Sequence, residues 1–99
     1  MSTVYINGTT AAATGADFVL AAGSSRTILA SSDDNSLGIP PDTFLTLQIK
    51  ETQNNGYINI GTICDNVNPV GVVTARGAGD STFRILKSTS SIAVEVLYD

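Results

Sequence analysis

The chain has 99 residues, which suits a single domain, and carries a formal net charge of −4 at pH 7 with 14% charged residues. It contains no His and one Cys, so Ser-His-Asp or Cys-His catalysis, a zinc site and an internal disulfide are excluded. Its five Lys and Arg residues are scattered, whereas nucleic acids and anionic membrane surfaces need clustered cations, so we expect neither as a partner.

The N-terminal part predicts short strands separated by turns and loops. β-Branched and aromatic residues between Gly, Asn and Ser turns predict strands at residues 3–6, 17–20 and 26–30. Residues 11–13 are alanines between Thr and Gly, which favours a loop. Residues 33–42 are also expected to form a loop, because two consecutive prolines cannot belong to a central strand. We therefore expect residues 1–15 to be an irregular N-terminal segment and residues 16–99 to be one β domain.

The clearest local signal is a β-hairpin over residues 43–64. Its first strand, residues 43–50, alternates apolar and polar side chains. Asn55-Gly56 is a strong turn signal, because both residues tolerate a positive φ. Residues 57–64 resume the alternation and end at Cys64. We predict a buried, core role for this thiol, with a reactive thiol or an intersubunit bridge as alternatives.

The C-terminal part continues the strand pattern to the end of the chain. Strands are predicted at residues 70–75, 81–87 and 92–98, with turns at 77–80 and 88–91. The spacing indicates an all-β protein: a small β-sandwich or barrel-like fold of seven to eight short, mainly antiparallel strands. The predicted core comprises Leu45, Leu47, Ile49, Ile58, Ile60, Phe83, Ile85, Val94 and Val96.

No residue pattern points to catalysis or to a bound cofactor. Asp33 and Asp34 are adjacent in a loop, and Glu95 lies opposite the apolar face of its strand, so solvated positions are favoured over an acid–base pair. Residues 33–35 and 65–68 carry oxygen ligands suited to calcium, but they lack the EF-hand spacing and resemble ordinary Asx turns. We predict no enzyme activity, no cofactor and no catalytic, cofactor-binding or metal-binding residue.

From Phe44 onward the order of the segments resembles small virion proteins of tailed bacteriophages. The resemblance rests on residues 47–51, a Gly turn, and residues 57–62, 81–85 and 92–96. It implies a β-sandwich accessory protein of the virion, synthesised in the host cytoplasm. A capsid decoration or cement protein is the leading type. Such a protein would bind the outer head surface and bridge subunits of the major capsid protein, with a homotrimer as the preferred assembly.

The N-terminal strand is the candidate interface. Its residues Thr3, Val4, Tyr5 and Ile6 include no charge and no Pro, the usual protection of an edge strand, so a partner is expected to cover it. Residues 1–15 would then act as an attachment arm, and a frayed terminus is the alternative. The alternative function is a carbohydrate- or receptor-binding module of a tail fibre or spike, with three scattered tyrosines as its only signal.

Overall fold

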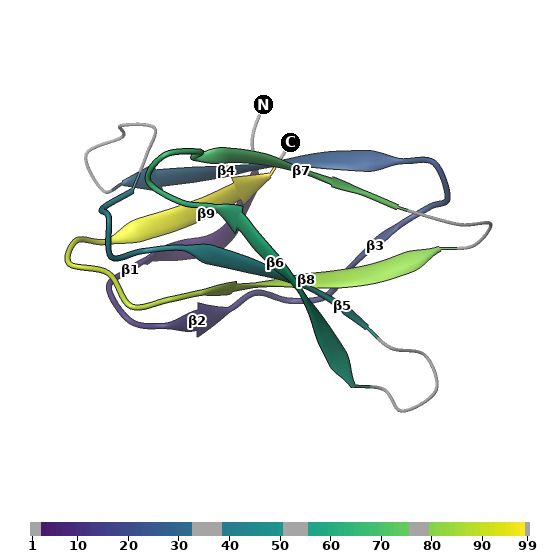
Figure 1. Cartoon of the computed structure of the whole chain (residues 1–99), viewed down its shortest axis with the longest axis horizontal. Helices are drawn as coiled ribbons and strands as arrows, with labels where there is room; N and C mark the ends of the chain where they lie inside the picture. Colours follow the sequence, from purple (N-terminus) through teal and green to yellow (C-terminus); the bar gives the residue numbers. More distant parts are fainter. Residues whose placement is uncertain (1–2, 33–38, 51–55, 76–79, 99) are drawn as a thin grey trace.

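A computed structural model describes residues 3–32, 39–50, 56–75 and 80–98. These residues form nine β-strands in two antiparallel sheets, which pack face to face as a small β-sandwich (Figure 1). The described part of the chain contains no helix long and apolar enough to cross a membrane. The predicted all-β class is confirmed, in the form of the sandwich rather than the barrel-like alternative, and the described residues form nine strands where seven to eight were predicted.

The two sheets have different edges. Sheet 1 has the strand order β1-β9-β4-β7, and sheet 2 has the order β2-β8-β5-β6. β3 also pairs with β8, beyond β2, so β2 and β3 together form one interrupted edge strand. Sheet 1 consists of β1 (Thr3–Thr9), β9 (Val94–Tyr98), β4 (Ser25–Ser32) and β7 (Val70–Thr74). Sheet 2 consists of β2 (Ala13–Thr14), β3 (Phe18–Leu20), β8 (Ser81–Lys87), β5 (Leu45–Lys50) and β6 (Tyr57–Cys64).

The predicted hairpin is present as β5 and β6, which pair antiparallel along their lengths. Its register shifts twice, and the residues left without a partner, Ile60 and Ile63, both lie on β6. Bulges of this kind bend the strand that carries them. The other predicted strands are present too, with ends that differ by at most three residues. The turn expected at 53–55, the glycine-rich turn at 77–79 and the acidic loop residues 33–35 lie outside the described residues.

The N-terminal segment is more regular than the sequence predicts. β1 continues to Thr9, past the Asn7-Gly8 pair that was expected to end it, and β2 forms where the sequence predicts a loop. Pairing with β9 and β8 supplies the backbone hydrogen bonds that local propensity alone does not predict. β1 and β2 therefore belong to the same two sheets as the other described strands.

Most of the predicted core lies between the sheets. Ile49 is partly buried, and six other predicted positions are buried: Leu45, Leu47, Phe83, Ile85, Val94 and Val96. They are joined there by apolar residues from the N-terminal half, including Ile6, Phe18, Leu20, Ile28 and Ala30. The second half of the chain therefore forms its core with the help of the segment in which the sequence signal is weakest.

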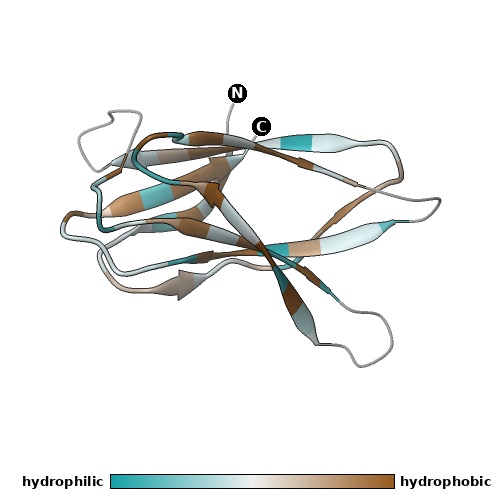
Figure 2. Cartoon of the chain, viewed as in Figure 1, coloured by the Kyte–Doolittle hydropathy of each residue, from teal (hydrophilic) through white to brown (hydrophobic). Residues whose placement is uncertain are grey.

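Two predicted core residues are exposed. Ile58 and Ile60 have 53% and 55% of their surface accessible. Ile58 lies opposite Ile49, so its side chain is on the predicted face of the sheet. Among the described residues, the opposite sheet does not extend far enough to cover it. β6 is the edge strand of sheet 2, and its apolar segments extend into the part that projects away from β7 (Figure 2). The period-2 pattern indicates which side chains share a face, but not how far the opposite sheet reaches.

Candidate interaction site

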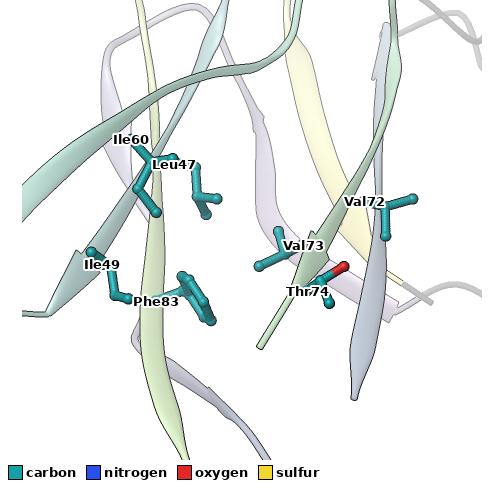
Figure 3. A pocket seen from close by; sticks show the side chains of 7 residues that line it. All are labelled: Leu47, Ile49, Ile60, Val72, Val73, Thr74 and Phe83. Atoms are coloured by element: carbon teal, nitrogen blue, oxygen red, sulfur yellow. The ribbon is translucent and has the colours of Figure 1, made fainter. Parts of the chain in front are cut away.

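The uncovered part of β6 borders an apolar cleft between the two sheets. The cleft has a volume of about 220 Å³. In Figure 3 the side chain of Val73 on β7 points toward the cleft, across from Phe83 of β8, whereas Val72 points away from it. The cleft is lined by Leu47, Ile49, Ile60, Val72, Val73, Thr74 and Phe83.

The cleft is open because β6 and β7 meet at one end and separate at the other (Figure 1). At their meeting point Gly71 lies directly against Ile63, and a Cβ on Gly71 would be 2.5 Å from the Ile63 carbonyl oxygen. A glycine is therefore needed for this close approach. Toward Ile60 the bulged strand β6 diverges from β7, so the inner faces of these two strands are no longer in contact.

The chemistry of the cleft favours apolar ligands. Its lining carries no charged side chain, and Thr74 provides the single side-chain hydroxyl. Burial of apolar surface stabilises a complex by roughly 25 cal/mol per Å², so the cleft suits the side chains of a partner. The lining offers no general acid, general base or charged group that could act on a substrate.

The outer face of sheet 2 carries a network of polar side chains. The Tyr57 hydroxyl donates to the Asp17 carboxylate at 2.6 and 2.7 Å, which raises the pKa of Tyr57. The Arg84 guanidinium lies 3.5 Å from the centre of the Tyr57 ring and donates from Nε to Oε1 of Gln48 at 2.7 Å. Gln48 in turn donates to Asn59 at 2.6 Å. The network links β6 to β5, to β8 and to the segment between β2 and β3.

The predicted interface residues Thr3, Val4, Tyr5 and Ile6 lie on β1, which pairs with β9 at one edge of sheet 1. Ile6 is buried in the core, whereas Val4 is exposed. Tyr5 packs inward and donates its hydroxyl to the Ala16 carbonyl, and burial raises its pKa to about 12. Tyr5 and Ile6 therefore pack inside the sandwich, whereas the side chain of Val4 is exposed to solvent.

The tyrosines occupy two different settings. Tyr5 and Tyr98 meet edge to face with ring centres 5.9 Å apart, and Arg26 lies 4.2 Å from the centre of the Tyr98 ring. Tyr57 instead lies beneath Arg84 on the outer face of sheet 2. Tyr57 is therefore the tyrosine whose surroundings, the Arg84 guanidinium and the Asp17 carboxylate, most resemble a polar binding surface.

Cys64 and Lys87 are both buried, but the sequence pattern is used above to predict burial only for Cys64. Cys64 is 1% exposed, its thiol donates to the Ile28 carbonyl, and burial raises its pKa to about 11. The core prediction for this thiol is confirmed. Lys87 is 2% exposed, and burial lowers its pKa. The period-2 spacing from Phe83 through Ile85 to Lys87 could have revealed that its side chain points inward.

The Lys87 ammonium is satisfied by neutral oxygens. It donates to the carbonyls of Ala11 and Ser88 at 3.0 and 2.9 Å and to the Ser90 hydroxyl at 3.1 Å. These three bonds fill its three donors. Lys87 therefore ties the segment between β1 and β2 to the turn that follows β8.

The oxygen-rich stretch at residues 65–68 is an Asx turn in the structure. One carboxylate oxygen of Asp65 accepts from the amides of Val67 and Asn68 at 2.9 and 2.8 Å. This pattern satisfies the turn by itself. Among the described residues there is no group of three or more His, Cys, Asp or Glu side chains that could hold a metal ion.

Comparison of the chain with protein-family models, curated proteins and solved structures finds no match. The function must therefore be argued from the chemistry of the surface. Among the described features, the apolar cleft and the adjoining free strand edges are the strongest candidate for an interaction site.

Proposed function

We propose that this protein is a structural component of a phage virion. Its most specific form is a capsid decoration or cement protein that binds the outer head surface and bridges subunits of the major capsid protein. The proposal rests on the resemblance of the segments after Phe44 to virion accessory proteins. The structural observation that supports it is the uncharged cleft, which half-exposed Ile60 of β6 lines and near which Ile58 of the same strand is also half exposed.

The surface chemistry supports docking through neutral contacts. The exposed apolar side chains include Ile58 and Ile60 of β6 and Val70 and Val72 of β7, the two strands beside the cleft, and only 14% of the residues are charged. Monomeric proteins rarely expose connected apolar patches without an interaction partner. A homotrimer stays the preferred assembly on the basis of the resemblance. A neutral interface also predicts that attachment survives high salt, because ionic contacts are the ones that salt screens.

Two measurements test this function. Mass spectrometry of purified particles should detect the protein at a fixed ratio to the major capsid protein, and its absence from particles would overturn the virion role. Sedimentation of the protein with particles that lack it should persist at about 1 M salt, where the Debye length is about 3 Å. Ile60→Ser should weaken this binding, whereas Val19→Ser, at an equally exposed position on β3, is the matched control.

The second candidate is a carbohydrate- or receptor-binding module of a tail fibre or spike. The observation that favours it is the outer face of sheet 2, where Arg84 lies over the Tyr57 ring and donates to Gln48, which in turn donates to Asn59. Aromatic rings and amides are groups that can stack on and hydrogen-bond to a sugar. A glycan array would decide: binding that is lost in Tyr57→Ala supports this function, and uniform silence removes it.

A further inference from the structure

The four edges of the two sheets are protected to very different degrees. Proteins guard free strand edges with bulges, charges, prolines or short strands, because an unguarded edge pairs with another chain. β1 and β6 each carry two register shifts, and β6 also has a positive φ of 143° at Gly61. β2 and β3 are two and three residues long, and the break between them carries Asp17. Each of these three edges has at least one protective feature.

β7 has none of these features. Its five residues pair with β4 in an unbroken register, and the sequence Val-Gly-Val-Val-Thr contains no charge and no Pro. Among the described residues no strand pairs with its other edge. Val70 and Val72 are exposed, the latter at 60% of its surface. β7 is therefore the edge of this sandwich best prepared to accept another strand.

The direction of the β7 backbone groups follows from two hydrogen bonds. The Pro69 carbonyl accepts from β4 at 2.8 Å, and the Ala75 amide donates toward β4 at 2.9 Å. Backbone groups of successive residues in an antiparallel strand point to opposite sides. The amides and carbonyls of Val70, Val72 and Thr74 consequently point away from β4, toward the free edge.

We propose that this edge pairs with β7 of a second copy of the chain, antiparallel and around a twofold axis at Val72. This register places Val72 opposite itself and Val70 opposite Thr74 of the partner, so every outward amide meets an outward carbonyl. A twofold interface must be self-complementary. β7 meets that condition, because no like charges face each other and β-branched residues pair well across strands. The pairing joins two copies of sheet 1 into one continuous sheet.

The cleft beside β7 provides the second reason for this arrangement. Val73 of β7 and Ile60 of β6 both line the cleft, and Ile60 remains about half exposed, as does Ile58 two residues before it on β6. The partner's β7, added beside β7, would place the partner's inner-face residues next to this cleft. The contact is small, below the about 1,200 Å² typical of stable complexes, so we expect a dimer that dissociates on dilution. The inference does not depend on the virion role, and a twofold dimer would take the place of the homotrimer that the resemblance implies.

Charge substitutions at Val72 test the pairing. In Val72→Lys two ammonium groups face each other across the axis, and in Val72→Glu two carboxylates do, so each variant should raise the dimer Kd several-fold. An equal mixture of the two variants should restore dimers, because opposite charges then meet. Val19→Lys, an equally exposed valine on the interrupted edge, should leave the Kd unchanged. Circular dichroism checks that all variants remain folded.

Sedimentation equilibrium of the full chain gives the decisive readout. A wild-type protein that stays monomeric up to about 1 mM, where even a millimolar Kd would populate dimers, overturns the proposal. A dimer Kd that is unchanged in Val72→Lys, or that is no lower in the equal mixture of the two variants, also overturns it. A trimer that survives Val72→Lys would support the assembly implied by the resemblance and would exclude the twofold contact at β7.

Discussion

The two margins of the sandwich are closed by different kinds of side chain. At the β1–β3 margin Tyr5 fills the space between the sheets and contacts Phe18 and Tyr98 edge to face, with ring centres 5.5 and 5.9 Å away. Arg26 covers the Phe18 and Tyr98 rings. Gly15 makes room for this arrangement, because any Cβ there would overlap the Tyr5 ring. Large rings thus close this margin.

The β6–β7 margin has no comparable group among the described residues. Gly71 brings the two strands together at one point, and beyond it the isoleucines of β6 reach neither β7 nor β4 closely enough to be covered. In this sandwich one margin is closed by large side chains that bridge the sheets, and the other stays open where β6 and β7 diverge with aliphatic residues between them. The open margin is where a partner can add to the fold.

The largest expected effect is the contrast between Phe18→Ala and Ile60→Ala. Phe18 is buried at the closed margin, so its truncation should lower the free energy of unfolding by about 3–5 kcal/mol. Ile60 is half exposed at the open margin, and its truncation should cost no more than about 1 kcal/mol. Urea unfolding measures both values. Similar losses at the two positions would show that the margins do not differ as described.

Gly71→Ala should have the next largest effect. Its Cβ would meet the backbone of Ile63, which cannot move aside like a flexible side chain. We expect a loss of about 1–3 kcal/mol, as for overpacking. Gly56→Ala is the control, since a Cβ there meets nothing within 4 Å. A Gly71 variant as stable as the control would mean that β6 and β7 do not need this close contact.

The alkaline stability should depend on Cys64. The native thiol has a pKa of about 11 against an ordinary value of 9.0, so above pH 9 the unfolded chain releases this proton first. The protonated thiol makes its full contribution to the free energy of unfolding below pH 9. This contribution falls by about 2 kcal/mol as the pH rises toward 11. Cys64→Ala should therefore lose less stability than the wild type between pH 8 and 11.

The comparison of the two proteins cancels the other titrating groups. The raised pKa of Tyr5 also makes the fold less stable at high pH. The lowered pKa of Lys87 has the opposite effect, because it makes the fold more stable as the pH rises toward 10.5. Both groups are present in both proteins. Urea unfolding at several pH values gives the two slopes, and parallel slopes would contradict the assignment of the pH dependence to the thiol.

The smallest expected effect is that of Tyr57→Phe. The variant removes the hydrogen bond to Asp17 but keeps the ring beneath Arg84. Because the pair lies on the exposed face, the melting temperature should fall by no more than a few degrees. Thermal unfolding measures it. A much larger fall would mean that the polar network, rather than the core, holds β6 in place beside the open margin.

The sequence predicts the fold better in the second half of the chain than in the first. Regular alternation and a strong turn signal identify β5, β6 and β8, because burial of one face requires a period of two. β2 could not be predicted, since two residues with weak propensity become a strand only when β8 offers them a partner. The same holds for the continuation of β1 beyond Asn7-Gly8.

The candidate site could be predicted only in part. The apolar character of Ile58 and Ile60 is visible in the sequence, but their exposure depends on where β7 ends and on the bulge at Ile60. The register that leaves Val70, Val72 and Thr74 with outward backbone groups depends on the pairing of β7 with β4. Nothing local in those residues indicates it.

The sequence by itself determined the all-β class, the absence of histidine chemistry and the faces of the longer strands, because composition and period are local properties. The tertiary structure alone decided which faces are covered, which edges stay free and where the ammonium of Lys87 finds its oxygens. Coverage and edge pairing depend on contacts between residues far apart in the chain. The cleft beside β7 arises from the divergence of β6 and β7. This divergence depends on how the two strands pack and is not visible in the sequence of either strand alone.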